Sequence, residues 1–266
     1  MTVDTVVEQL WPGAVALVEP LGGGITNHNF KVEVGGEAFV LRISGKDTEL
    51  LGIDRGHEHA ASLVAARLGV GPEVVAFVEG CLVTRFVGGH PAERVAPADA
   101  GGLLRTIHDG PPIPSRFDSF RVVEEYHALA GARGVPIPSA YEEASRRAAE
   151  IEGRRGAATA RTCHNDLLAA NFIDAGTRLW LVDWEYAGMG DPFFDLGNFA
   201  ANHELDGDGE RELLSAYGSD DLDALHDMRF MSDFREAMWG VVQQGISALD
   251  FDFAGYADKH FERALA

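Results

Sequence analysis

The sequence predicts an α+β protein of two lobes, in which a small lobe built on an antiparallel sheet precedes a larger, mainly helical lobe. Roughly the first 85 residues consist of short apolar runs rich in β-branched residues and separated by glycines. Most of the chain from residue 210 to residue 266 instead shows helical spacing of apolar residues. The break GGHP at residues 88–91 separates the two regions. We therefore expect an N-terminal lobe of residues 1–87 and a C-terminal lobe of residues 88–266.

The N-terminal lobe is expected to be a meander of strands with one helix. The segments VALVEPL, NFKVEV and AFVLRIS are separated by glycines at residues 22–24 and 35–36, and the second pair suits a tight hairpin turn. Helical spacing runs from Asp54 to Leu68, and the segment from Gly69 to Pro72 ends that helix. The segment VEGCLVTRFV then predicts two further short strands.

The C-terminal lobe is expected to be mostly helical. Residues 98–108 and 142–153 have helical spacing, with the proline-containing segments PPIPSRF and GVPIPSA between them. AGTRLWLVDWEY predicts a turn and a strand. Nearly everything from Glu210 to Ala266 predicts helix.

Composition indicates a folded globular protein, with 46% hydrophobic and 24% charged residues. No apolar run approaches the ~18 to 20 residues that a membrane helix needs, and the start MTVDTVVEQLWPG has no basic region ahead of an apolar one. We expect a cytoplasmic protein without membrane insertion. Cys81 and Cys163 lie outside any Cys/His ligand spacing, which favours reduced thiols over a thiolate metal site.

The net charge of −20 arises from 42 acidic against 22 basic residues. Such a charge opposes binding to nucleic acid, so no nucleic-acid partner is expected. It favours solubility and would attract small cations. The oligomeric state cannot be predicted from these features.

The segment HNDLLAAN at residues 164–171 carries the clearest chemical signal. Asp166 is followed five residues later by Asn171 and, twelve residues after that, by Asp183 at the end of the apolar run LWLV. Phosphoryl transfer needs such a set: one carboxylate orients a hydroxyl and accepts its proton, while an amide and a second carboxylate hold Mg²⁺ against ATP phosphates. We predict Asp166 as the catalytic base and Asn171 and Asp183 as metal ligands.

Two neighbours of these residues have other predicted roles. His164 is expected to be structural, with its ring bonded to backbone or to a second carboxylate. Glu185 lies two residues after Asp183. It could reach a second metal or a metal-bound water, or it could be a solvated or hydrogen-bonded loop acid, and the sequence leaves both alternatives open.

The nucleotide is expected to contact the glycine-rich turn between the first two strands. Gly23 and Gly24 allow backbone amides to approach phosphate closely, and the side chains of Thr26 and Asn27 can donate hydrogen bonds to it. The alternative is a simple hairpin turn. The position of this turn ahead of the other parts favours the phosphate-binding interpretation.

A cation for the phosphates is expected at Arg42 in the third strand, FVLRIS. Glu58 lies on the following helix and could form an ion pair that fixes the guanidinium. A surface salt bridge is the alternative. The chain order of glycine turn, basic strand, acidic helix, catalytic loop and metal-binding Asp favours the functional interpretation.

The sequence resembles the choline/ethanolamine kinase family within the aminoglycoside-phosphotransferase-like superfamily. The resemblance rests on GGGITNHNF with FVLRISG, on CHNDLLAANFI with LWLVDWEYAG, and on WGVVQQGISALDFDFAGYADKHF. It implies a two-lobed protein-kinase-like fold and the roles given above for Asp166, Asn171, Asp183, Arg42 and Glu58. The acid in FFDLGN, at residue 195, would brace the catalytic loop.

The resemblance also implies sites for adenine and for the acceptor. Backbone groups around residues 84–86, including Arg85 and Phe86, would bind adenine. Trp239 and Tyr256 match positions of an aromatic box that holds a quaternary ammonium by cation–π attraction. Glu236 replaces a further aromatic residue of eukaryotic choline kinases, which leaves room for a smaller or differently shaped amine.

By this resemblance, the protein would be an ATP- and Mg²⁺-dependent kinase that phosphorylates the hydroxyl of a small cationic amino alcohol, most readily choline and next ethanolamine. The alternative is an aminoglycoside-type antibiotic phosphotransferase, because GMGDPFFDLGN resembles a pattern common to those enzymes. A catalytically inactive binding module with the same fold is a further alternative. The intact set Asp166, Asn171 and Asp183 argues against inactivity.

Overall fold

The structure is a computed structural model that describes residues 2–22, 27–45, 48–156 and 158–266. The described residues belong to two compact units, one within Met1–Glu93 and Ala170–Tyr186 and the other within Arg94–Ala169 and Ala187–Ala266. The first unit contains the larger sheet and the second is mostly helical, which confirms the predicted α+β class. The lobe boundary between residues 87 and 88 stays a prediction.

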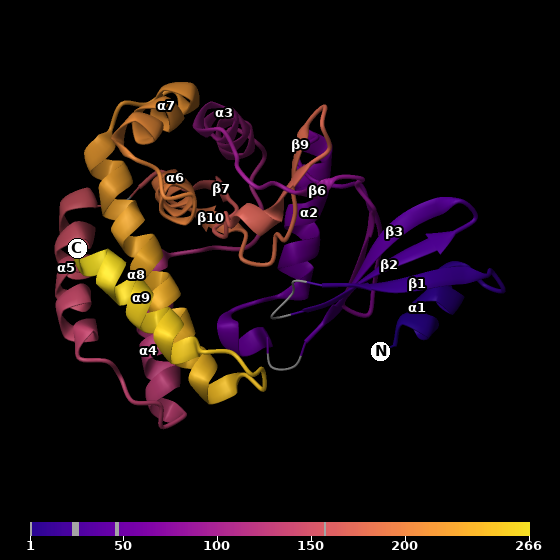
Figure 1. Ribbon diagram of the computed structural model, residues 1–266, viewed down its shortest axis with the longest axis horizontal. Helices are drawn as coiled ribbons and strands as arrows, with labels where there is room; N and C mark the ends of the chain where they lie inside the picture. The colour runs from indigo at the N-terminus through magenta and orange to yellow at the C-terminus, as the bar shows by residue number, and fades with distance from the viewer. Residues whose placement is uncertain (1, 23–26, 46–47, 157) are drawn as a thin grey trace. The chain divides into compact units, whose positions relative to one another are not determined.

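The first unit is built on a five-stranded antiparallel sheet with the order β1-β2-β3-β5-β4, of which β1, β2 and β3 are labelled in Figure 1. Gly35 and Gly36 both have positive φ, at 61° and 85°, and form the tight turn between the second and third strands as predicted. The strands are β1 (Ala16–Leu21), β2 (Asn27–Val34), β3 (Glu37–Ser44), β4 (Val74–Val78) and β5 (Cys81–Arg85).

Two helices accompany this sheet. Helix α1 (Val3–Leu10) buries Val6 and Val7 in a core that also contains Val32, Leu41 and Val83 of the strands. The sequence patterns had not indicated α1. Helix α2 (Arg55–Leu68) is preceded by the short 3₁₀ helix η1 (Thr48–Leu51).

The ends of α2 agree closely with the prediction. The Asp54 side chain accepts a hydrogen bond from the His57 amide at 2.9 Å, which caps the N-terminus, and Gly69 ends the helix in the left-handed conformation with φ of 71°. Glu58 lies in the first turn of this helix and is buried.

A second, three-stranded sheet brings the middle of the chain into the first unit. It pairs β6 (His90–Pro91) with β8 (Phe172–Asp174) and β8 with β9 (Leu179–Leu181). The Leu181 amide donates to the Val70 carbonyl at 2.8 Å, and the Val182 amide donates to the Asn171 carbonyl at 2.9 Å. These bonds fix the backbone at Asn171 and at the two residues that precede Asp183. The 3₁₀ helix η2 (Ala169–Asn171) precedes β8.

Helices make up most of the second unit, together with the short antiparallel pair β7 (Arg161–Cys163) and β10 (Gly188–Gly190). Helix α8 is buried through most of its length and packs against α4, α6 and α9 (Figure 1). None of the described helices combines the length and apolarity that a membrane-spanning segment requires. The helices are α3 (Pro97–His108), α4 (Ser119–Ala132), α5 (Ala140–Arg155), α6 (Pro192–Asn202), α7 (Gly207–Tyr217), α8 (Leu222–Ile246) and α9 (Phe253–Leu265).

Close packing of α6 on α8 depends on Gly197. A Cβ atom at Gly197 would lie 2.4 Å from the backbone of Met228 and Arg229, which is closer than real Cβ contacts allow. We expect Gly197→Ala to reduce the free energy of unfolding by about 1 to 3 kcal/mol, the usual cost of overpacking. Urea denaturation measures this change.

Gly102→Ala is the matched control, because Gly102 also lies within a helix but has open space around it. There the substitution should stabilise the protein by up to about 1 kcal/mol through helix propensity. Equal effects of the two substitutions would contradict the packing argument.

Candidate active site

The loop that carries Asp166 is anchored to helix α6 in the second unit. The carboxylate of Asp195 accepts hydrogen bonds from the amides of His164 and Asn165, at 2.8 and 2.7 Å. The side-chain oxygen of Asn198 accepts a third bond, from the Leu167 amide, at 2.6 Å. The loop backbone is therefore held at three amides by buried acceptors, and the bonds expected of Asp195 are present.

The prediction did not include Asn198, although its signal was available in the sequence. Asn198 follows Asp195 by three residues and so lies on the same side of helix α6. The imidazole of His164 is fully buried, and its Nδ1 accepts from the Asp166 amide at 3.3 Å. This bond matches the structural role predicted for His164.

His108, Cys163 and Asp195 place three potential metal-binding atoms within 4.8 Å of one another. Asp195 already accepts two loop amides and lies 3.0 Å from Nε2 of His108. Burial raises the pKa of the Cys163 thiol well above its ordinary value, which disfavours the thiolate form that binds metals. Within this cluster, Asp195 braces the catalytic loop.

A buried arginine lies beside Asp166. The Arg235 side chain on helix α8 is 2% exposed, and its Nη1 lies 3.8 Å from Oδ1 of Asp166, whose side chain is 13% exposed. The same nitrogen donates a hydrogen bond to Glu236. Sequence analysis missed Arg235, although the adjacent opposite charges of Arg235 and Glu236, flanked by Phe234 and Ala237, were a visible signal.

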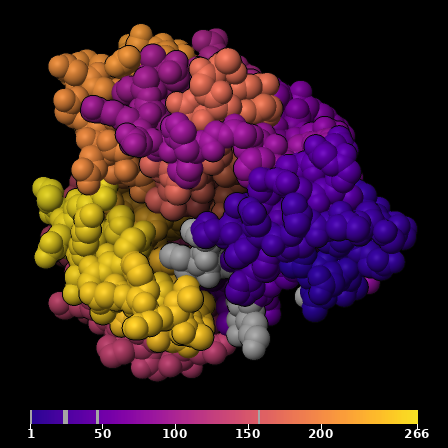
Figure 2. Space-filling view, turned by 45° about the vertical axis from the view of Figure 1, so that its right-hand side comes forward, coloured from indigo at the N-terminus to yellow at the C-terminus, as the bar shows by residue number. Residues whose placement is uncertain are grey.

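Both predicted acceptor residues come together in the second unit. The rings of Trp239 on α8 and Tyr256 on α9 meet edge to face, with centroids 5.6 Å apart. The Tyr256 hydroxyl donates to Glu236 at 2.6 Å. Helix α9 and the residues before it, in yellow, form part of the molecular surface (Figure 2). Trp239 itself is only 8% exposed. The box role of these two rings stays a prediction.

Glu236 is negatively charged and Tyr256 is neutral at physiological pH. Burial would raise the pKa of Glu236, but the Arg235 charge and the Tyr256 hydrogen bond outweigh it and lower the pKa below its ordinary value. Burial and the Glu236 carboxylate both raise the pKa of Tyr256. The group of Trp239, Tyr256 and Glu236 thus includes one fixed anion.

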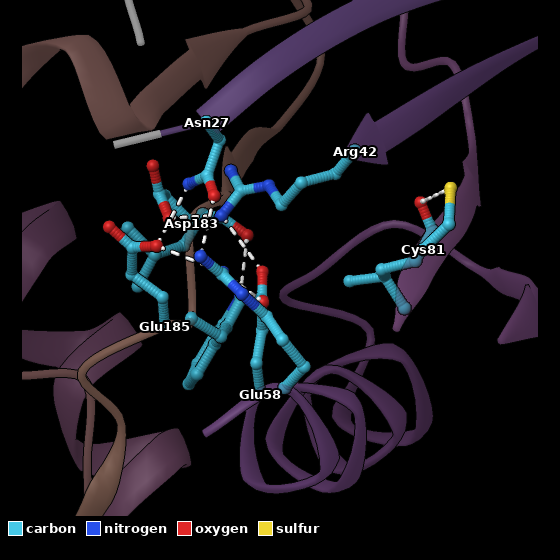
Figure 3. Close-up of polar contacts among 10 residues, drawn as sticks. Asn27, Arg42, Glu58, Cys81, Asp183 and Glu185 are labelled. Carbon is cyan, nitrogen blue, oxygen red and sulfur yellow. Dashed lines mark hydrogen bonds and ion pairs between the residues drawn. The ribbon is translucent and has the colours of Figure 1, made fainter. Parts of the chain in front are cut away.

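Several other predicted residues cluster in the first unit, where polar and charged side chains converge from strands β2 and β3, helix α2 and the segment after β9 (Figure 3). Arg42 donates to Glu58 at 2.8 Å and is also ion-paired with Asp183. Burial would lower the pKa of Arg42, but the charges of Asp183 and Glu58 outweigh it and raise the pKa above its ordinary value. The ion pair expected between Arg42 and Glu58 is therefore present.

Arg55 is the member of this cluster that sequence analysis missed. It donates to Glu58 at 2.7 Å, to Glu185 at 3.1 Å and to the Asn27 side-chain oxygen at 2.7 Å. Asn27 in turn donates to Glu185 at 2.8 Å. Glu185 is thus a buried, hydrogen-bonded acid, which favours the second of the two alternatives for this residue. Arg55 lies three residues before Glu58 on one helix face, which was the available signal.

A cavity of about 390 Å³ adjoins this cluster within the first unit. Apolar side chains such as Val40, Leu82 and Ile173 form part of its wall. The predicted residues that line it are Arg42, Glu58, Arg85, Phe86, Asn171 and Asp183. An apolar cavity with a few convergent charged groups is the usual form of a small-molecule site.

Some of the groups predicted to contact the nucleotide already form hydrogen bonds within the protein. The amides of Arg85 and Phe86 already donate to the carbonyls of Glu73 and Ala38, at 2.8 and 2.9 Å, so these two groups are not available to adenine. The side chain of Asn27 is engaged with Glu185 and Arg55. Gly23, Gly24 and Thr26 lie outside the described residues, and the predicted phosphate contacts of this turn stay predictions.

Asn171 and Asp183 both line the cavity and supply oxygen donors, which are the ligands that hard divalent cations prefer. Asp183 has φ of 69° and lies two residues beyond strand β9. Its carboxylate is paired with Arg42, which is also paired with Glu58. The negative charges of Asp183 and Glu58 would therefore both offset the charge of a cation bound there. The donor set fits Mg²⁺.

Comparison with known proteins identifies the class. A family model described as "Phosphotransferase enzyme family" matches residues 17–231, and the chain belongs to this family. Protein LicA of Haemophilus influenzae is 28% identical over 210 residues, which cover 73% of this chain and 61% of that protein. Ethanolamine kinase 1 of Mus musculus is 25% identical over 312 residues, covering 95% of this chain and 84% of that protein.

Solved structures agree with this assignment. A choline/ethanolamine kinase family protein from Mesorhizobium loti is 30% identical, with a TM-score of 0.82 over 100% of this chain and 94% of that one. Choline kinase LicA from Streptococcus pneumoniae is 24% identical and shares the fold, with a TM-score of 0.83 over 99% and 96% of the two chains. The predicted resemblance and the protein-kinase-like fold are confirmed.

Proposed function

We propose that this protein is an ATP- and Mg²⁺-dependent kinase that transfers the γ-phosphoryl group to the hydroxyl of a small cationic amino alcohol, choline or ethanolamine. The observation that carries the proposal is the group formed by Arg42, Glu58 and Asp183 on the wall of the 390 Å³ cavity. A fixed cation beside two anions suits the binding of a metal–polyphosphate complex. Relatives named as choline and ethanolamine kinases support the choice of acceptor.

On the nucleotide side, Arg42 contacts the phosphates and Glu58 with Asp183 holds its guanidinium in place. Asn171 and Asp183 would hold Mg²⁺, which when bound would neutralise charge that develops on the phosphate oxygens. The apolar wall of the cavity receives the base. A neighbouring structure of LicA was solved in complex with AMP, which supports nucleotide binding in this fold.

On the acceptor side, Asp166 orients the hydroxyl and takes its proton. The acceptor oxygen forms a bond to the γ-phosphorus while the bond between that phosphorus and the β–γ bridging oxygen breaks. The products are a phosphomonoester and ADP. Anchoring of the loop by Asp195 and Asn198 keeps the Asp166 carboxylate in one position, which lowers the entropic cost of the step.

The amine of the acceptor is placed by Trp239, Tyr256 and the charge of Glu236. We expect Tyr256→Leu to raise the KM for choline by about 5- to 30-fold, because a cation–π contact contributes roughly 1 to 2 kcal/mol. The KM for ATP should change little. Steady-state assays of ADP release measure both constants.

Tyr256→Phe is the matched control, since it keeps the ring and removes only the hydroxyl bonded to Glu236. Tyr256 suits this test better than Trp239, whose replacement would leave a cavity among buried side chains. An unchanged KM for choline in a folded Tyr256→Leu variant would remove Tyr256 from the acceptor site.

An acceptor panel of choline, ethanolamine and kanamycin tests the proposed function as a whole. We expect ATP consumption that depends on choline or ethanolamine. Phosphorylation of kanamycin with no use of either amino alcohol would refute the proposed acceptor class and favour an antibiotic phosphotransferase.

A further inference from the structure

Arg235 is a buried cation, and one of its nitrogens, Nη1, faces two carboxylates. Nη1 bonds to Glu236 and lies 3.8 Å from Oδ1 of Asp166, and all three residues belong to the second unit. A buried charge is tolerated only where partners offset its desolvation. Without such partners, a buried arginine would destabilise the folded protein.

A direct hydrogen bond ties the Arg235 guanidinium to Glu236, its neighbour on helix α8. A separation of 3.8 Å is too long for a hydrogen bond, so the attraction to Asp166 acts through charge. The direct bond goes to Glu236, which also accepts the Tyr256 hydroxyl at 2.6 Å. The bond to Glu236 therefore helps to hold the positive charge beside Asp166.

Other charged groups around this site have partners of their own, although the charge of His260 also acts on Glu236. On α8, Asp233 pairs with His260 of α9 at 2.8 Å and with Arg263 of α9 at 3.2 Å. On α6, Asp195 accepts the loop amides, and in the loop His164 accepts the Asp166 amide. Tyr256, the α9 residue bonded to Glu236, stays neutral.

We propose that Arg235 is a positioning residue for phosphoryl transfer, which keeps the Asp166 carboxylate ionised and oriented toward the acceptor hydroxyl, and that Glu236 moderates its charge. This inference rests on the proposed role of Asp166 as the base. Because an opposite charge nearby favours the ionised carboxylate and a like charge disfavours it, the two neighbours act on Asp166 with opposite signs.

Because the two neighbours act with opposite signs, their removal should move the pKa of Asp166 in opposite directions. A merely structural role for Arg235 predicts no such pair of shifts. Removing the cation in Arg235→Met should raise the pKa of Asp166 by about one pH unit or more, given that an opposite charge within ~4 to 6 Å shifts a carboxyl by about 1 to 3. Removing the anion in Glu236→Gln should lower it. Arg235→Lys keeps the charge and should remain close to the unmodified protein.

The pKa is measured by ¹³C NMR on protein labelled at the aspartate carboxyl carbons, with Asp166→Asn identifying the resonance. Arg229→Met is the matched control, because Arg229 is also on α8 but pairs with Glu210. An unchanged Asp166 pKa in folded Arg235→Met would overturn the inference. If that variant does not fold, an unchanged or raised pKa in Glu236→Gln would overturn it instead.

Kinetics supply the second readout. The acid limb of the pH profile of kcat/KM for the acceptor should move to higher pH in Arg235→Met and to lower pH in Glu236→Gln. Lower activity in both variants with no displacement of the limb would mean a structural role only. Failure of the unmodified protein to use either amino alcohol would refute the proposed function, whereas the NMR titration would still decide whether Arg235 acts on Asp166.

Discussion

Asp166→Asn is expected to lower turnover by about 10²- to 10⁴-fold, the range typical for loss of a positioned general base. The substitution keeps the size of the side chain and leaves the loop amides bonded to Asp195 and Asn198, so the loop should keep its conformation. ATP binding should stay measurable, because the residues that line the nucleotide cavity belong to the first unit. Turnover and ATP affinity are measured on the same purified sample.

Asp118→Asn is a matched control for the same chemical change. Asp118 caps helix α4 in the second unit, and Asn is an equally good N-cap residue, so activity and stability should both be unchanged. Normal turnover in folded Asp166→Asn would remove Asp166 from the mechanism.

Asp183→Ala and Asn171→Ala are expected to raise the Mg²⁺ concentration needed for half-maximal activity, each by at least about 10- to 100-fold. Loss of a residue that only hydrogen-bonds a metal ligand already lowers metal affinity by about 10- to 100-fold. Asn171 and Asp183 would each supply a ligand oxygen directly, so the effect of losing either should be at least as large. Asp183→Ala also leaves Arg42 with Glu58 as its remaining carboxylate partner in this cluster, so the guanidinium should hold the phosphates less precisely in place. Activity is titrated with Mg²⁺ at fixed ATP.

Glu73→Ala controls for the loss of an acid from the first unit. Glu73 forms an exposed ion pair with Arg85, and exposed pairs contribute little to stability. Its Mg²⁺ requirement should therefore equal that of the unmodified protein. Full activity of Asp183→Ala at ordinary Mg²⁺ would contradict its assignment as a ligand.

The parts of this fold that the sequence predicts well are those with local signals. Helix α2 was predicted almost to the residue, because Asp54 caps its start and Gly69 ends it, and both act through neighbouring backbone. Helix α4 was missed because the proline-containing segments on either side of it resemble one continuous irregular connection. Strand β9 is shorter than the apolar run suggested, so Asp183 lies beyond the strand rather than at its end.

The residues of the candidate site likewise divide into those that the sequence predicts and those that it does not. Asp166, Asn171 and Asp183 stand in an ordered motif, and Arg42 with Glu58 follows from the order of elements. Arg55 and Arg235 have no such motif. Each has one partner nearby in the sequence, Glu58 or Glu236, but tertiary structure brings the second acid near. Glu185 is 130 residues from Arg55 in the sequence. Only the folded chain shows that Arg55 reaches Glu185 and that Arg235 lies beside Asp166.

The central claim is that the protein moves the γ-phosphoryl group of ATP to the hydroxyl of an amino alcohol. The most direct test follows ATP, Mg²⁺, choline or ethanolamine, and the protein in one tube by ³¹P NMR. We predict that the γ-phosphate signal is replaced by a phosphomonoester signal of the acceptor, in equal amount to the ADP formed, and that Asp166→Asn slows this change. Release of the γ-phosphate as inorganic phosphate, or no loss of ATP with either acceptor, would contradict the claim.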